Sequence, residues 1–177
     1  MLKRNVLIIS LIVLAACAQP PIPYPVAPKS APAPSVRAMK VDRVVVNKGD
    51  RELMLIRGGK VIRTYPVALG PNPRGHKIME GDGRTPEGSY VLDWRNPNSR
   101  FYRSIHVSYP DPADRLLAAQ LGVSPGGMIM IHGEANYLSF GGQPSGDWTE
   151  GCIAVSNGVM DEIWALVDDG TPILINP

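Results

Sequence analysis

Short apolar runs separated by turn residues make up most of the chain from about residue 37 onward. Runs of this length, bounded by glycine, proline or asparagine, are typical of β-strands. Between the second and third runs, Gly58 and Gly59 predict a two-residue hairpin turn. We therefore expect one mainly β domain, with strands near residues 43–47, 51–57, 60–69, 88–94, 104–110, 127–133, 152–156 and 172–176.

Two segments carry helix signals. In residues 111–122, Asp111 is a suitable N-cap and Pro112 follows it at the first helical position. In residues 156–170, Ser156 is the expected N-cap and Gly170 the expected stop. The apolar residues of the second segment share one face, which predicts packing on the core: Val159, Met160, Ile163, Trp164 and Val167.

The N-terminus predicts export. Lys3 and Arg4 precede an apolar run of residues 6–14, and small residues then lead to Cys17, as in a secretory signal peptide. The run is too short for a transmembrane helix, which needs about 20 apolar residues. The ending LAAC resembles the lipobox of bacterial lipoproteins, which implies that residues 1–17 are a lipoprotein signal and that Cys17 is lipidated. The alternative is an ordinary cleaved signal with a cysteine there by chance.

Residues 18–36 are rich in proline and alanine and have no hydrophobic periodicity, which predicts an extended tether rather than part of a core. At about 3.1 Å per residue, such a tether reaches on the order of 50 Å. The predicted organisation is a signal peptide (1–17), a tether (18–36) and one folded domain (37–177). Ala18 and Gln19 follow Cys17 with no aspartate, which by resemblance implies sorting to the outer membrane, with the domain in the periplasm.

The charge of the mature chain gives little help in choosing a partner. Removal of the signal takes away two of the 18 basic residues, which leaves 16 Lys and Arg against 16 Asp and Glu. There is no lysine-rich block and no basic face with interleaved aromatics, so a nucleic-acid partner is not expected. The histidines and Cys152 have no recognisable zinc-ligand spacing, and residues 80–88 fail the EF-hand pattern. We expect neither a metal nor a cofactor.

Cys152 is the candidate nucleophile. If Cys17 is lipidated, Cys152 has no disulfide partner, although the periplasm favours disulfides. An unpaired thiol is then either a small buried apolar group or a reactive one. A thiol becomes a good nucleophile when a neighbouring histidine takes its proton. His132 is the best placed of the three histidines, because it ends an apolar strand and Gly133 leaves room for close backbone approach.

These residues carry a family resemblance. IHG at residues 131–133, followed by TEGCIAVSN at residues 149–157, resembles the signature of the YkuD-type L,D-transpeptidases. Upstream, the segment TPEGSY at residues 85–90 is similar to a further motif of that family. The resemblance covers residues 41–177 and implies a β-sandwich or barrel-like catalytic domain with two short helices.

The resemblance also implies roles for individual residues. It makes Cys152 the nucleophile, His132 the general base and the Gly133 backbone the group that orients the imidazole. The N–H groups of Gly151 and Cys152 would form the oxyanion hole, which an acyl transfer requires.

The chain departs from the family pattern at two positions. Glu150 stands where the family commonly has a second histidine, and Ala154 where many members have a substrate-binding arginine. An ionised Glu150 would oppose thiolate formation if it pointed inward. It could instead point to solvent, with Asp147, Trp148 and Thr149 forming a different rim. Four basic residues are candidates for binding a substrate carboxylate, with Arg84 preferred: Arg74, Lys77, Arg84 and Arg95.

The expected function is a peptidoglycan L,D-transpeptidase that acts on stem peptides through a thioester. The acyl acceptor could be a neighbouring stem, which gives a 3-3 cross-link, or a lysine of a lipoprotein. If water is the acceptor, the same site is a carboxypeptidase or an amidase. A further alternative is a wall-binding lipoprotein that keeps the fold without the activity. The lipid anchor would also bind the protein to a membrane.

Overall fold

The computed structural model describes residues 40–136 and 145–177, so the predicted signal peptide and tether lie outside the described residues. Within these ranges the chain forms β1 (Arg43–Asn47), β2 (Glu52–Arg57), β3 (Lys60–Pro66), β4 (Gly88–Ser99), β5 (Tyr102–Val107), β6 (Met130–His132), β7 (Ile153–Ala154) and β8 (Thr171–Asn176). The helices in the same ranges are α1 (Pro112–Gln120) and α2 (Asn157–Leu166). None of the described helices is long and apolar enough to cross a membrane.

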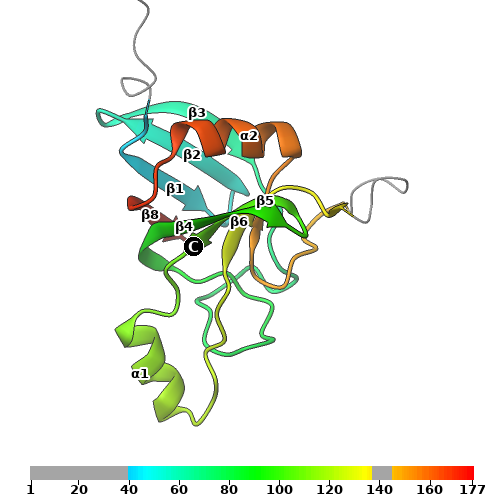
Figure 1. Ribbon diagram of the computed structural model, residues 1–177. Coiled ribbons are helices and arrows are strands. Elements are labelled where there is room, and N and C mark those ends of the chain that lie inside the picture. Colours follow the sequence, from blue (N-terminus) through cyan, green and yellow to red (C-terminus); the bar gives the residue numbers. More distant parts are fainter. Residues whose placement is uncertain (1–39, 137–144) are drawn as a thin grey trace, which may run out of the picture. The chain divides into compact units, whose positions relative to one another are not determined.

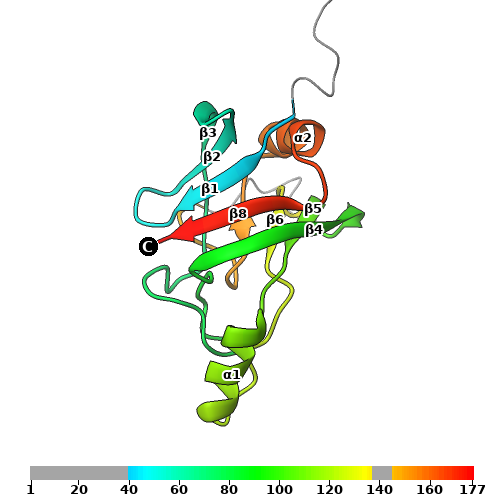
Figure 2. The same ribbon diagram turned by 90° about the vertical axis from the view of Figure 1, so that its left-hand side faces the viewer.

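The strands form a single curled sheet (Figures 1 and 2). Its order is β3-β2-β1-β8-β4-β5-β6-β7, with parallel pairing only between β1 and β8 and between β6 and β7. Ala68, two residues beyond β3, forms an antiparallel bridge with Ala154 in β7. The two ends of the sheet therefore meet, which confirms the expected mainly β, barrel-like class with two short helices.

The core is formed by alternate side chains of the strands. Val44 and Val46 of β1 are fully buried and pair with Ile173 and Ile175 of β8. Each such side chain contributes about 1.5–3 kcal/mol when it is removed from water. This parallel pairing joins the first and last strands of the domain.

The two helices begin where expected. The Asp111 side chain accepts a hydrogen bond from the N–H of Asp114 and completes a capping box with it, and Ser156 caps α2 through the N–H of Val159. Of the α2 stripe, Met160, Ile163 and Val167 are fully buried, and the other two members pack against the core.

Several expected boundaries were wrong. Strand β3 ends at Pro66 rather than at residue 69, β5 ends at Val107 rather than at residue 110, and β6 begins at Met130 rather than at residue 127. Helix α2 ends at Leu166 rather than at Gly170, because Val167 is already extended and its side chain enters the core. Strand β4 runs through Pro97 to Ser99, well beyond the expected end at Trp94. Proline is tolerated here because the β4–β5 pairing is irregular in this stretch, and such irregularities relieve the need for a ladder N–H.

Candidate active site

Strands β6 and β7 bring the two predicted catalytic residues to neighbouring positions. In their parallel register, His132 lies opposite Ala154, and Cys152 comes directly before β7, two residues ahead of Ala154. Side chains two residues apart on a strand share a face, so Cys152 and His132 are diagonal neighbours on one side of the sheet. No hydrogen bond joins the two side chains, and the Cys152 thiol donates to the Met128 carbonyl oxygen at 3.5 Å.

The tautomer of His132 follows from its hydrogen bond. Nδ1 lies 2.7 Å from the carbonyl oxygen of Gly133, which can only accept, so Nδ1 must carry the proton. Nε2 therefore holds the basic lone pair. Burial lowers the pKa of His132, although the bond to Gly133 opposes this, and the side chain is only 3% exposed. The resting imidazole is neutral and can accept a proton.

Two aromatic rings flank His132. The Phe101 ring centroid lies 4.5 Å from the imidazole centroid, and the Trp148 ring meets the imidazole edge-on at 5.7 Å. Trp148 is held through its neighbour Asp147, which forms a 2.7 Å ion pair with Arg51 and accepts a hydrogen bond from the Leu69 N–H. The imidazole is thus fixed by a carbonyl at one nitrogen and by packing on its sides.

The environment of Cys152 favours the neutral thiol. Burial raises the pKa of Cys152, and the negative charge of Glu150 adds to this effect. A hydrogen bond from the Met130 backbone and the positive charge of Lys77 act in the opposite direction but do not cancel the rise. The thiol and the imidazole therefore rest as a neutral pair, not as a thiolate and an imidazolium.

Thr149 shapes the loop that carries the thiol. Its hydroxyl donates to the carbonyl oxygen of Cys152 at 2.7 Å and accepts from the Gly151 N–H at 3.2 Å. The Gly151 N–H, one of the two expected oxyanion donors, is therefore already engaged. The N–H of Cys152 makes no hydrogen bond to a described residue, so it is the better candidate for that role.

Gly151 is packed against the loop of residues 70–87. Its φ of +119° and the space around it both require glycine, because a Cβ would lie 2.4 Å from the Arg84 carbonyl oxygen. The Thr85 hydroxyl donates to the Gly151 carbonyl oxygen at 2.9 Å. The position of the nucleophile thus depends on how firmly this loop is held.

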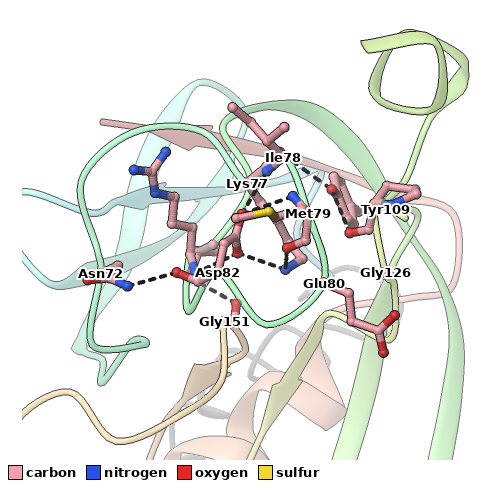
Figure 3. A network of polar contacts seen from close by, with 12 residues as sticks. Asn72, Lys77, Ile78, Met79, Glu80, Asp82, Tyr109, Gly126 and Gly151 are labelled. Carbon is pink, nitrogen blue, oxygen red and sulfur yellow. Dashed lines mark hydrogen bonds and ion pairs between the residues drawn. The ribbon is translucent and has the colours of Figure 1, made fainter. Parts of the chain in front are cut away.

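An acidic turn holds that loop (Figure 3). The Asp82 carboxylate accepts from the N–H groups of Ile78, Met79 and Arg84 and forms a 2.9 Å ion pair with buried Lys77. Burial alone would raise the pKa of Asp82, but these donors hold it below its ordinary value. Figure 3 shows Gly151 next to this network.

A cleft of about 1050 Å³ borders the catalytic pair, although neither Cys152 nor His132 lines it. Trp148 lines the cleft and also contacts His132, and Ala154 lines it two residues after the thiol. Further parts of the wall come from the β1–β2 turn, the loop of residues 71–75, Arg84 and Glu134. The cleft is therefore the natural place for the parts of a substrate that do not react.

The structure separates the candidate carboxylate-binding residues into two kinds. Lys77 is buried against Asp82, and Arg95 is paired with Asp169 at 2.6 Å and lies outside the cleft. Arg74 and Arg84 line the cleft, and neither forms an ion pair with a described acidic residue.

The structure also shows where the remaining predicted residues lie. Glu150 is exposed and so points to solvent, the second of the two orientations considered. His76 forms a 2.9 Å contact with Asp114, and His106 one of 2.7 Å with Asp93. These two histidines are engaged elsewhere. In the described part of the chain, no group of three or more histidine, cysteine or acidic side chains could hold a metal ion.

Sequence reasoning missed the residues that hold the site. The sequence indicates Thr149 only as part of a rim, and Asp82 only as a member of residues 80–88, which fail the EF-hand pattern. The pairing of Arg51 with Asp147 joins residues 96 positions apart, so no local pattern indicates it. One local signal indicated the role of Asp82: an aspartate directly before a glycine, as in Asp82–Gly83, is typical of an Asx-type turn.

The described residues form a curled β domain with a cysteine directly before one strand and a buried histidine on the adjacent strand. The model of the YkuD L,D-transpeptidase catalytic domain matches residues 41–175. The chain belongs to this family.

Two curated relatives are similar over part of their length. YafK of Escherichia coli K12, named as a candidate L,D-transpeptidase, is 32% identical over 111 residues, which are 61% of this chain and 38% of YafK. YkuD of Bacillus licheniformis, named in the same way, is 30% identical over 135 residues, which are 76% of this chain and 66% of YkuD. The chain therefore spans less than two thirds of each.

Solved structures share the fold. The helical cell shape determining protein Pgp2 of Campylobacter jejuni, solved as a K307A mutant, is 27% identical with a TM-score of 0.60, over 76% of this chain and 46% of that one. Bd1075 of Bdellovibrio bacteriovorus is 25% identical with a TM-score of 0.54, over 78% of this chain and 49% of that one.

Proposed function

We propose that this protein is a peptidoglycan L,D-transpeptidase in which Cys152 is the nucleophile and His132 the general base. The substrate is a stem peptide with D-alanine bonded to the L-centre of meso-diaminopimelate. Family membership supports the reaction class. The observation that carries the assignment is the hydrogen bond from Nδ1 of His132 to Gly133, because it leaves Nε2 basic beside the strand that directly follows Cys152.

The first half-reaction forms a thioester. Nε2 of His132 takes the thiol proton as Sγ of Cys152 attacks the carbonyl carbon on the L-centre of diaminopimelate. The negative charge that develops on the carbonyl oxygen is met by the N–H of Cys152. The carbon–nitrogen bond to D-alanine then breaks, and the imidazolium returns its proton to the leaving amine.

The second half-reaction transfers the acyl group. An amine attacks the thioester carbonyl, His132 takes a proton from that amine, and the proton returns to Sγ as the carbon–sulfur bond breaks. An amine from a neighbouring stem gives a 3-3 cross-link, and a lysine amine gives an anchored lipoprotein. If water attacks instead, the products are those of a hydrolase. The acceptor depends on water exclusion by the cleft walls.

The nucleophile is tested by covalent labelling. A carbapenem opens its ring on an acylable thiol, so we expect one adduct per protein by intact mass. The Cys152→Ala variant should give none. An equal adduct on that variant, or none on the native protein, would remove Cys152 from the proposal.

The outcome of the reaction is tested on purified sacculi. Incubation followed by muropeptide analysis should show 3-3 cross-linked products for a transpeptidase. Shortened stems or released lipoprotein, without new cross-links, would instead assign a hydrolase. Because Pgp2 is described as a cell shape determining protein, altered cell shape is an expected result of deleting the gene.

The raised pKa of Cys152 favours a second candidate, a non-catalytic protein that holds stem peptides in the cleft. Stem-peptide binding by the native protein, with no adduct and no change in sacculi, would support it.

We further propose that the protein is an outer-membrane lipoprotein of the periplasm, anchored through Cys17. The support is the sequence LAAC and the proline-rich segment of residues 18–36. We expect the native protein in the outer-membrane fraction and Cys17→Ala in the soluble periplasmic fraction. The same soluble location for both proteins would contradict the lipid anchor.

A further inference from the structure

The cleft contains two arginines that make no ion pair with a described residue. The guanidinium of Arg84 donates only a long 3.4 Å hydrogen bond through Nη1 to the His76 carbonyl oxygen. Arg74 is exposed and forms no ion pair with an acidic group among the described residues. Guanidinium groups bind carboxylates through two parallel hydrogen bonds, so a concave wall with two uncommitted arginines suits an anionic ligand.

The other basic side chains of the cleft are committed to the fold. Lys48 is 1% exposed, and its ammonium contacts Glu87 at 2.8 Å and the carbonyl oxygens of Gly75 and Thr85. Arg51 is engaged with Asp147. These groups are saturated, and a ligand that displaced them would leave a buried charge unpaired.

Glu134 carries the one acidic side chain of the cleft wall that makes no ion pair with a described residue. Its N–H donates to Oδ1 of Asn157 at 2.9 Å, which fixes the backbone directly after Gly133. The carboxylate therefore belongs to a wall whose position is set, one residue from the carbonyl that orients His132.

We propose that this cleft binds an amino-acid group that carries both a carboxylate and an ammonium. Arg84 and Arg74 bind the carboxylate, and Glu134 binds the ammonium. The inference rests on the proposed function, in which the D-centre of the donor diaminopimelate is such a group. It makes these three residues the determinants of donor specificity.

The neighbouring residues fit this assignment. Ala154 also lines the cleft, and its small side chain leaves space where the family resemblance leads one to expect an arginine. The carbonyl oxygen of Arg84 packs against Gly151, which places the base of this side chain beside the nucleophile loop. The cleft wall that carries Arg84 is thus continuous with the loop that carries the thiol.

The test uses synthetic tetrapeptide donors and D-alanine release, which reports both transfer and hydrolysis. One donor has free diaminopimelate, one has its D-centre carboxylate amidated, and one has its D-centre amine acetylated. The purified protein should release D-alanine about tenfold faster from the free donor than from either modified one, the effect of a charged hydrogen bond.

Variants separate the two halves of the site. Arg84→Gln should lose discrimination against the amidated donor and keep it against the acetylated donor. Glu134→Gln should show the converse. Arg115→Gln, an exposed change on α1 away from the cleft, is the matched control and should keep both preferences.

Other outcomes overturn the inference. Equal rates with all donors would do so, as would a variant that slows all donors by one factor. Calorimetric binding of the same donors to Cys152→Ala needs no chemistry, so preferences that persist there would support the cleft even if the proposed reaction failed.

Discussion

Thr149 makes the two hydrogen bonds that close the nucleophile loop, and removing its hydroxyl should destabilise the protein. The side chain is 6% exposed, and Gly151 is buried. Thr149→Val keeps the shape of the side chain but leaves the Cys152 carbonyl and the Gly151 N–H without their partner. Each buried group left unpaired costs about 1–3 kcal/mol, so for the two groups together we expect a loss of about 2–6 kcal/mol in the free energy of unfolding.

Thr149→Ser is the matched control, because it keeps the hydroxyl and loses one methyl group. Its expected cost is about 1 kcal/mol. Urea denaturation of both variants measures the difference through the transition midpoint at constant slope. The carbapenem adduct should form more slowly on Thr149→Val than on Thr149→Ser. Equal midpoints for the two variants would show that the hydroxyl does not hold the loop.

Three further changes test the electrostatics of the site. Glu150→Gln removes a negative charge near the thiol, so the pH midpoint for iodoacetamide alkylation of Cys152 should fall, and an unchanged or higher midpoint would contradict the assigned effect. His132→Gln should slow carbapenem acylation by about 10²–10⁴-fold while alkylation at high pH persists, and unchanged acylation would exclude it as the base. Asp82→Asn should lower stability at pH 7 in urea titrations. Because the native pKa of Asp82 is lowered, this difference should be full above the unfolded carboxyl pKa of about 3.9 and shrink as pH falls through the native pKa, and a difference that grows in acid would refute it.

The strands and helix starts could be predicted from local patterns because their causes are local. Asp111 and Ser156 cap helices through backbone groups three residues away. The sheet order could not, because the parallel pairing of β1 with β8 joins residues about 130 positions apart. The end of α2 was missed because the tertiary burial of Val167 outweighed the glycine signal.

In the candidate site, too, the local features could be predicted and the long-range ones could not. Cys152 and His132 stand in a compact motif, so the sequence indicated them directly. Which arginines remain uncommitted depended on distant partners: Arg95 is engaged by Asp169, whereas the Arg84 guanidinium forms no ion pair with a described acid. Residue type alone could not show which of these basic side chains is available to bind a substrate carboxylate.

The resting neutral pair has a mechanistic consequence. Since Cys152 has a raised pKa and His132 a lowered one, proton transfer at rest would create two charges that their surroundings disfavour. A substrate carbonyl changes this balance, because the negative charge passes from sulfur to an oxygen that can accept from the Cys152 N–H. Transfer of the thiol proton to His132 then takes place together with the attack of Sγ on the carbonyl carbon. A thiol that is ionised only when a carbonyl is in place reacts slowly with other electrophiles, so the burial that weakens the free nucleophile also makes it selective.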